Sequence, residues 1–148
     1  MIERRYNEIV SSNNYYFRGD NMKYSRQREV ILEEVKSRYD HPTADMIYHS
    51  VLEKIPNISL GTVYRNLNQL VEHGLIRKIL IPDDSDRFDF NLKNHQHLYC
   101  TCCKQVFDIE SNVLKGIDKV IEKETNYIIL SHEIVFTGIC EACNRKKV

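Results

Sequence analysis

The feature that most constrains this chain is a cysteine spacing that occurs twice near its end. Cys100 and Cys103 form one CxxC pair, and Cys140 and Cys143 form another. Two such pairs supply four thiolates, which is the ligand set of a tetrahedral structural zinc ion. A disulfide framework fits poorly, because the five cysteines are an odd and clustered set. The spacing predicts one structural zinc ion per chain, joining the start of a small domain to its end.

The fifth cysteine, Cys102, falls outside this four-ligand set, and we interpret it as a bystander thiol. It would replace Cys103 as a ligand only in a tighter CxC loop. A dithiol redox centre is the other interpretation of these cysteines. It is less favoured because the flanking sequence does not resemble the strand-to-helix setting of a thioredoxin motif.

The composition is that of an ordinary folded protein, with 148 residues, 42% hydrophobic residues and a formal net charge of +0. This balance gives no general support for nucleic-acid binding, so any DNA contact must come from a local basic surface. No apolar run approaches the ~20 residues that a membrane span needs. The N-terminal sequence MIERRYNEIV carries charges where a secretory signal needs an apolar core, so we expect a cytoplasmic protein without membrane contact.

Helical spacing of apolar residues predicts three helices in the first 90 residues. The first helix follows Ser25, the second follows Thr43, and the third runs from Ser59 to a terminating Gly74. The apolar stripe expected on the first helix consists of Val30, Ile31, Val35 and Tyr39. Two β-rich runs then flank the turn PDDSD, which predicts a hairpin. This order is that of a winged helix-turn-helix.

The rest of the chain predicts a smaller unit that contains a sheet. Short strands flank the cysteine turn, a helix begins at Ser111, and the segment 127–140 forms one or two strands. We therefore expect an α+β fold, with an N-terminal winged helix-turn-helix domain over residues 1–90. A hinge over 91–94 and a small α/β domain over 95–148 complete the predicted organisation.

A second group of metal-capable side chains surrounds the predicted hinge. His95 and His97 are two residues apart, which places both imidazoles on the same face of a strand. Asp108 follows the cysteine turn, Asp89 ends the hairpin, and His41 precedes the second helix. Three nitrogen and two oxygen ligands suit Fe(II), Mn(II) or Zn(II). The ordinary interpretation is that His41 is a helix cap and Asp89 is surface of the hairpin. A metal bound by residues of both domains would fix the angle between them.

These residues lie in motifs that resemble the ferric uptake regulator (Fur) family of bacterial metal-dependent repressors. The motifs are SRQREVIL, HPTADMIY, SLGTVYRNLNQLVEHGLI, RFDF, HQHLYCTCC and GICEAC. The resemblance implies a homodimeric DNA-binding repressor that is not an enzyme, with 95–148 as its dimerisation and metal-binding domain. The implied structural zinc ligands are Cys100, Cys103, Cys140 and Cys143. The implied ligands of a regulatory Fe(II) or Mn(II), one per chain, are His41, Asp89, His95, His97 and Asp108.

Within this family, the residue at position 108 separates two branches. Iron-sensing members usually carry Glu where this chain has Asp108, while the peroxide-sensing repressors (the PerR branch) usually carry Asp. Iron sensors also build a further site. Its positions here are Asn94, Gln96 and His132, and only the histidine is a residue type that could ligate a metal. The chain therefore resembles the peroxide-sensing branch most.

The resemblance implies that peroxide reacts at bound Fe(II) and oxidises a ligand histidine, His41 or His95, after which the repressor leaves DNA. The alternative is an iron- or zinc-responsive repressor of metal-uptake genes. A zinc hydrolase is a third hypothesis, but the sequence has no HExxH motif, and five ligands leave little room for substrate. One departure from the family is Lys104, which stands where a glycine usually follows the first CxxC.

The third predicted helix is the expected DNA reader. Its outer face offers Ser59, Thr62, Tyr64 and Arg65, with Asn68 one turn further on. Arg65 is the best candidate for a guanine edge. Residues 1–28 carry 6 basic and 3 acidic side chains, and Lys23, Arg26 and Arg28 are expected at phosphates or in the minor groove. A two-fold dimer should prefer an inverted repeat in double-stranded DNA.

Overall fold

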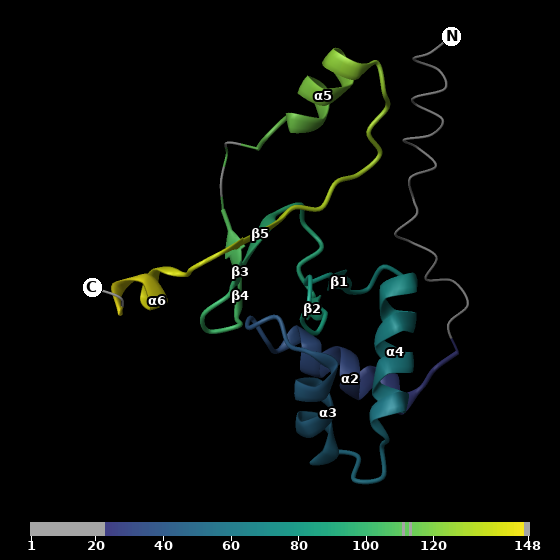
Figure 1. Ribbon diagram of the computed structural model, residues 1–148. Helices are drawn as coiled ribbons and strands as arrows, with labels where there is room; N and C mark the ends of the chain where they lie inside the picture. The colour runs from purple at the N-terminus through teal and green to yellow at the C-terminus, as the bar shows by residue number, and fades with distance from the viewer. Residues whose placement is uncertain (1–22, 111, 113, 147–148) are drawn as a thin grey trace. The chain divides into compact units, whose positions relative to one another are not determined.

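The computed structural model describes residues 23–110, 112 and 114–146 of this chain (Figure 1). These residues belong to two compact units, of which the first ends at Lys93 and the second begins at Asn94. Within the described ranges, no helix combines the length and the apolar character that crossing a membrane requires.

The first unit contains three helices followed by a hairpin. Its elements are α2 (Arg26–Lys36), α3 (Ala44–Leu52), α4 (Leu60–Glu72), β1 (Arg77–Ile79) and β2 (Arg87–Asp89). β1 and β2 are antiparallel, which confirms the predicted winged helix-turn-helix order. The predicted caps are also confirmed, since the side chains of Ser25, Thr43 and Ser59 each accept a backbone N–H of the first helical turn.

The core of the first unit lies between the inner faces of the helices and the hairpin. Its fully buried residues are Ile31, Val35, Ile47, Val51, Val63, Leu67, Leu70 and Phe88. The inclusion of Tyr39 in the apolar stripe was wrong, because its side chain is 92% exposed. Helix α2 ends at Lys36, so the chain has already turned before the helical spacing would bring Tyr39 to the core.

Helix α4 ends at a left-handed glycine, as the sequence predicts. Gly74 has a φ of 66°, and its N–H donates to the carbonyl of Val71 at 2.9 Å. The N–H of Leu75 donates to the carbonyl of Leu70 at 2.9 Å. These two bonds form a Schellman motif, which satisfies the last carbonyls of the helix and directs the chain into the wing.

The second unit contains a three-stranded sheet and two helices. Its elements are β3 (Gln96–Cys100), β4 (Val106–Ile109), α5 (Ile117–Thr125), β5 (Val135–Gly138) and α6 (Glu141–Arg145). The strand order is β4-β3-β5, with β3 antiparallel to β4 and parallel to β5. Helices followed by a small mixed sheet confirm the predicted α+β class.

The helix predicted from Ser111 begins later, at Ile117, and this part of the prediction was wrong. Gly116 stands at the N-cap with a φ of 83°, and a right-handed helix cannot continue through a residue in that conformation. Ser111 lies outside the described residues. The segment 127–140 contributes a single strand, β5.

Among the described residues of the second unit, few apolar side chains are buried, and those outside the cysteine cluster are Tyr99 and Val106. Its buried cluster consists of Cys100, Cys140 and Cys143, with Leu98 packed against it. Helix α5 has no buried residue. Exposed large apolar side chains of this unit are Phe107, Val120, Ile121, Tyr127, Ile128, Leu130, Phe136 and Ile139. A single copy of this unit therefore leaves much of its apolar surface uncovered.

Candidate metal centres and DNA-reading surface

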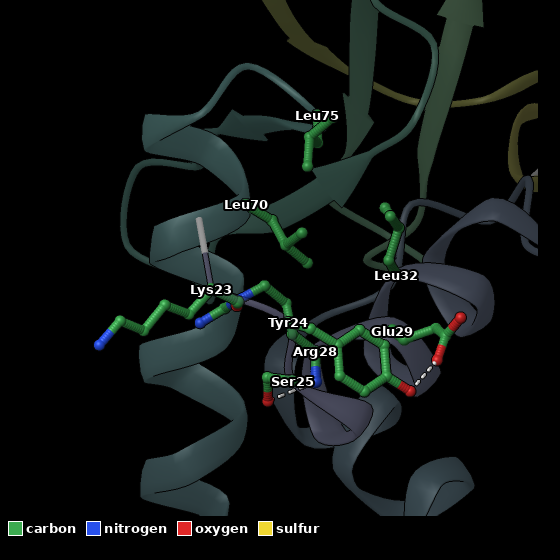
Figure 2. A pocket seen from close by; sticks show the side chains of 8 residues that line it. All are labelled: Lys23, Tyr24, Ser25, Arg28, Glu29, Leu32, Leu70 and Leu75. Atoms are coloured by element: carbon green, nitrogen blue, oxygen red, sulfur yellow. Dashed lines mark hydrogen bonds between the residues drawn. The ribbon is translucent and has the colours of Figure 1, made fainter. Parts of the chain in front are cut away.

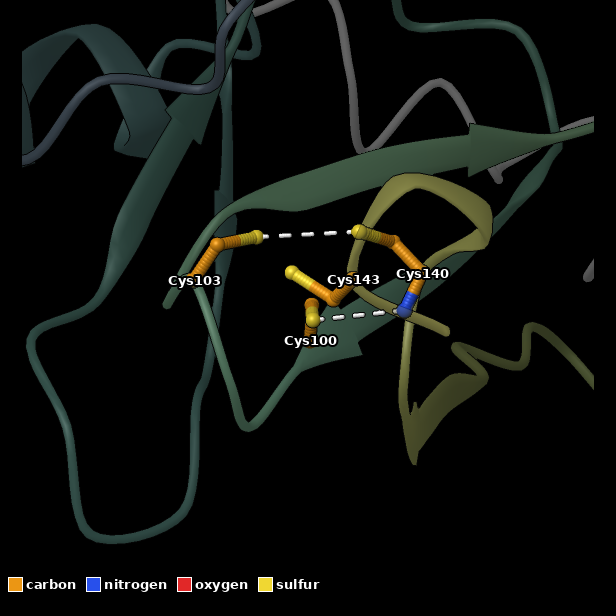
Figure 3. A group of neighbouring side chains, drawn as sticks. All are labelled: Cys100, Cys103, Cys140 and Cys143. Carbon is orange, nitrogen blue, oxygen red and sulfur yellow. Dashed lines mark hydrogen bonds between the residues drawn. The ribbon is translucent and has the colours of Figure 1, made fainter. Parts of the chain in front are cut away.

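The structure brings Cys100, Cys103, Cys140 and Cys143 together, with their four sulfur atoms within 4.8 Å of one another (Figure 3). The Sγ atoms of Cys103 and Cys140 are 3.8 Å apart. Thiolates at about 2.3 Å from a tetrahedral zinc ion have sulfur atoms about 3.8 Å apart. The group therefore has the ligand type, number and spacing of a structural zinc site. Cys102 is exposed and is not a member of this group.

A tight turn presents the first two cysteines of this group. The carbonyl of Cys100 accepts the N–H of Lys104 at 2.8 Å, and the N–H of Cys100 donates to the carbonyl of Gln105 at 2.9 Å. Lys104 has a φ of 61°, the left-handed conformation that glycine adopts without strain. The turn is therefore formed with lysine in place of the glycine that the family resemblance predicts after the first CxxC.

The thiols of this group differ in acidity, and their environments explain the difference. Backbone N–H groups of Cys103 and then Cys140 donate toward the Cys100 sulfur and lower its pKa to about 6. Hydrogen bonds with the thiols of Cys140 and then Cys102 raise the pKa of Cys143. Four adjacent thiolates repel one another, so full deprotonation of the group requires a cation among them. A divalent zinc ion fits this requirement.

A second cluster lies on the sheet of the second unit. His97 on β3 is paired in register with Asp108 on β4, and His95 directly precedes β3. The Oδ1 atom of Asp108 lies 3.2 Å from Nε2 of His95 and 3.5 Å from Nε2 of His97. The two imidazole centroids are 4.4 Å apart. The sheet thus holds two nitrogen donors and one carboxylate close together.

The first unit holds the two remaining predicted ligands, His41 and Asp89. Their ligand atoms lie within 4.8 Å of one another. Phe88 on β2 donates its N–H to the carbonyl of Pro42 at 3.0 Å, which fastens the loop of His41 beside the strand that carries Asp89. The Oδ1 atom of Asp89 accepts the N–H of Asn91 at 2.7 Å. Imidazole and carboxylate are the donors that Fe(II) and Mn(II) accept, so each unit offers part of a suitable set.

The predicted DNA-reading residues lie at the start of α4. Ser59 and Arg65 are exposed and Thr62 is half-buried. The Oγ atoms of Ser59 and Thr62 are 2.9 Å apart. Tyr64 is 41% exposed, and its hydroxyl donates to Asp45 at 3.4 Å. Burial, and then the charge of Asp45, raise the pKa of Tyr64, so its phenol remains a hydrogen-bond donor.

A pocket of about 210 Å³ lies between the start of α2 and the end of α4 (Figure 2). Its lining residues include Lys23, Tyr24, Arg28, Glu29 and three leucines. Arg28 donates to the carbonyl of Lys23 and to the side chain of Gln69 on α4, so it joins two helices. Tyr24 donates to Glu29 at 2.8 Å, and this hydrogen bond raises the pKa of the phenol. These contacts join the two helices and give Tyr24 no activation as a nucleophile.

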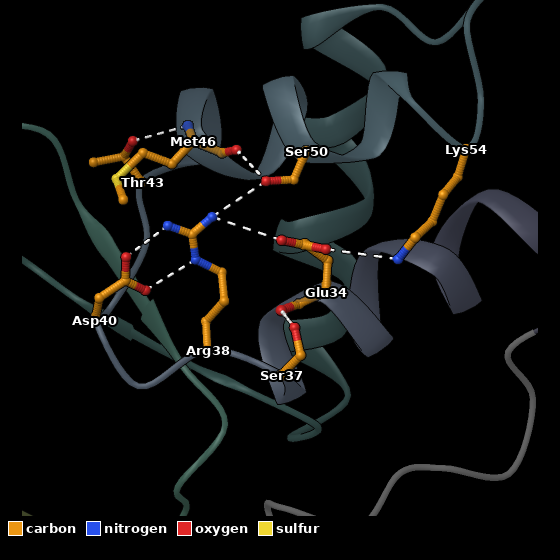
Figure 4. A network of polar contacts seen from close by, with 8 residues as sticks. All are labelled: Glu34, Ser37, Arg38, Asp40, Thr43, Met46, Ser50 and Lys54. Carbon is orange, nitrogen blue, oxygen red and sulfur yellow. Dashed lines mark hydrogen bonds and ion pairs between the residues drawn. The ribbon is translucent and has the colours of Figure 1, made fainter.

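Residue spacing did not predict a group of charged residues beside His41. Arg38 and Asp40 form an ion pair at 2.6 Å, directly before the histidine (Figure 4). The signal available in the sequence was the placement of these opposite charges in the four residues before Pro42. Spacing alone does not distinguish such a pair from solvated surface charges.

Comparisons with known proteins agree with this geometry. A model of the ferric uptake regulator family matches residues 19–137. The peroxide-responsive repressor PerR of Staphylococcus aureus (strain USA300) is 32% identical over 145 residues, which cover 98% of this chain and 95% of that protein. The chain belongs to the ferric uptake regulator family. This Fur-family protein is therefore a metal-responsive, dimeric, DNA-binding repressor and not an enzyme.

Solved structures of other Fur-family proteins share the fold. The Fur protein of Helicobacter pylori has a TM-score of 0.75 at 23% identity, covering 97% of this chain and 91% of that one. The peroxide stress regulator of Campylobacter jejuni has a TM-score of 0.69 at 24% identity, covering 96% of each chain. Fur-family proteins use structural zinc and a regulatory iron or manganese ion, and the four-thiol group and the histidine and aspartate groups match these two requirements.

Proposed function

We propose that this protein represses transcription until it meets peroxide, and that Fe(II) at the regulatory site makes it responsive. The proposed ligands are His41, Asp89, His95, His97 and Asp108. The similarity to the peroxide-responsive repressor of S. aureus supports this function over iron or zinc sensing. An iron- or zinc-responsive repressor of metal-uptake genes is the alternative that the experiment below tests.

The observation that carries the proposal is the position of Asp108. Its carboxylate lies within 3.5 Å of both His95 and His97, so one short side chain on β4 reaches both imidazoles. Glutamate at this position would place its carboxylate one methylene further from the strand. The aspartate therefore defines a compact set of ligands, and this residue type is the one that peroxide-sensing family members usually carry.

The proposed response depends on ligands that come from both units. Fe(II) held by these ligands would activate peroxide beside the ligand histidines, and the imidazole that is oxidised supplies the two electrons that reduce the peroxide. In the net reaction, one peroxide oxygen is added to the imidazole ring of His41 or His95 and the other leaves as water. The modified ring is a poorer ligand, so the metal no longer joins the two units. The DNA-reading helices of the dimer then lose the spacing that operator binding requires.

On DNA, we propose that α4 enters the major groove, with Arg65 at a base edge and Ser59, Thr62 and Tyr64 beside it. Lys23 and Arg26 are exposed and are proposed to contact phosphates. The exposed apolar residues of the second unit supply the surface through which two copies associate. The two-fold dimer would bind an inverted repeat in double-stranded DNA, in the cytoplasm.

The test compares the Fe(II)-loaded and Mn(II)-loaded zinc dimer on an inverted-repeat DNA selected with the Mn(II)-loaded protein. A low dose of hydrogen peroxide should release only the Fe(II) form, and mass spectrometry should find 16 Da added to the peptide of His41 or His95. Asp108→Glu is the matched variant. It should retain metal-dependent DNA binding and lose most of the peroxide response. Unmodified histidines and undiminished DNA binding in both metal forms would instead identify an iron or other metal sensor.

A further inference from the structure

The backbone of His41 is held in an unfavourable conformation. Its φ is 49°, in the left-handed region that residues with a Cβ atom rarely adopt. Pro42 follows, and a residue before proline prefers an extended conformation. Something in the surrounding structure must therefore hold this loop in place.

One restraint acts on the loop after His41 and another acts before it. After the histidine, the carbonyl of Pro42 accepts the N–H of Phe88. Before it, Asp40 is held by Arg38 through two hydrogen bonds, from Nε to Oδ1 at 2.9 Å and from Nη2 to Oδ2 at 2.6 Å. This two-bonded fork fixes the orientation of Asp40 as well as its distance. The residue that precedes His41 therefore has little freedom to rotate.

The fork is itself fastened to two helices. Nη1 of Arg38 donates to Oγ of Ser50 on α3 at 3.3 Å and lies 3.6 Å from Oε1 of Glu34 on α2 (Figure 4). The other carboxylate oxygen of Glu34 lies 3.7 Å from Nζ of Lys54, just beyond α3. Arg38 is only 20% exposed, although Asp40 is 47% exposed. The guanidinium thus connects the loop of His41 to the helix pair that precedes the DNA-reading helix.

We propose that Arg38 and Asp40 are positioning residues for the regulatory metal. The fork stabilises the left-handed backbone at His41, so that the imidazole is already placed when the metal arrives. It also fastens this loop to α2 and α3. This inference rests on the proposed function, in which His41 is a ligand, and adds two residues that do not touch the metal.

The test measures the affinity of the zinc-loaded, full-length dimer for Mn(II), using electron paramagnetic resonance to count free Mn(II). Arg38→Gln and Asp40→Asn should weaken Mn(II) binding by about 10- to 100-fold, the usual effect of removing a group that orients a metal ligand. Arg38→Lys should be no better than Arg38→Gln, because an ammonium cannot form the two-bonded fork. At saturating Mn(II), all three variants should bind the selected inverted-repeat DNA as the unmodified protein does.

Two control variants, Glu33→Gln and His41→Ala, distinguish the possible results. Glu33→Gln removes the exposed ion pair between Glu33 and Lys36 on α2 and should leave the affinity for Mn(II) unchanged. His41→Ala should abolish tight Mn(II) binding. Tight Mn(II) binding by His41→Ala would show that His41 is not a ligand, and it would overturn both the proposed ligand set and the positioning role that depends on it. If His41→Ala weakens binding while Arg38→Gln and Asp40→Asn do not, the positioning role is overturned and the proposed function stands. A loss of DNA binding that saturating Mn(II) does not restore would make the fork merely structural.

Discussion

At the scale of single residues, backbone strain lies beside both metal-binding groups. Among the described residues, the non-glycine residues with positive φ are His41, Asp83, Lys104 and Asn126. His41 is a proposed ligand, and Lys104 directly follows the zinc-binding pair of the first turn. A strained backbone conformation persists only where neighbouring groups hold it in place. A bound metal would add such a restraint at His41 and in the cysteine turn before Lys104.

Replacing Lys104 by glycine should relieve strain in the cysteine turn. We expect Lys104→Gly to raise the free energy of unfolding of the zinc-loaded protein by about 0.5 to 1 kcal/mol, because glycine adopts the left-handed conformation without a Cβ clash. Urea unfolding followed by circular dichroism measures the change. Lys104→Ala is the control, since it keeps the strain and removes the Lys104–Tyr99 ring contact. An equal gain in stability from alanine would show that strain is not the cause.

The sequence predicted which side chains lie together where a short, regular spacing along the chain brings them together. Two CxxC pairs bring four sulfurs together, and the two-residue spacing of His95 and His97 brings two imidazoles to Asp108. Spacing did not reveal the fork of Arg38 and Asp40. Their contact depends on the chain turning after Ser37, and a spacing of two residues does not show whether two opposite charges touch.

At the scale of helices and strands, the sequence predicted a boundary correctly where one residue, such as a capping serine or a terminating glycine, defines it. Ser25, Thr43 and Ser59 cap the three helices of the first unit, and Gly74 ends the last of them. The start of α5 was not predicted, since apolar periodicity continued upstream and Gly116 gave no sign of its left-handed φ. Periodicity likewise carried the first helix too far, to Tyr39.

The Schellman motif at Gly74, between α4 and the wing, predicts how a substitution of this glycine changes stability. Gly74→Ala should lower the free energy of unfolding by about 1 kcal/mol, because alanine at a φ of 66° is strained while the two closing hydrogen bonds still require that conformation. Thermal unfolding of the zinc-loaded protein provides the measurement. Gly61→Ala, within the exposed first turn of α4 and with ordinary space for a Cβ atom, is the control and should not destabilise the protein. An unchanged midpoint for Gly74→Ala would contradict the assignment of strain.

At the scale of the whole chain, the two units differ in how they are stabilised. The first has a continuous apolar core built from three helices and a hairpin. In the second, the described buried residues form a cluster of three cysteines against which the partly buried Leu98 packs, with Tyr99 and Val106 as the other buried apolar residues, and α5 has no buried residue. The sequence did not predict this contrast, because the apolar residues of 127–139 suggest a core but are mostly exposed in a single chain.

Removal of zinc should therefore unfold the second unit selectively. After chelation, or in Cys143→Ser, amide hydrogen exchange should become fast in β3 and β5 while α4 remains protected. The reason is that structural zinc contributes on the order of 10 kcal/mol to the folding of small metal-binding units. Cys102→Ser is the matched control and should retain both zinc and protection, since this thiol lies outside the four-sulfur group. Continued protection of β3 without zinc would show that the sheet is stable by itself.

The scarcity of buried apolar residues in the second unit also affects how newly synthesised chains mature. In the proposed dimer, the exposed apolar side chains of a nascent chain are covered only after it has acquired zinc and met a second copy. Assembly is therefore second order in chain concentration, and chains made faster than they pair are substrates for proteases. We expect the number of functional repressors in a cell to rise more steeply than the rate of synthesis and to fall when zinc is scarce.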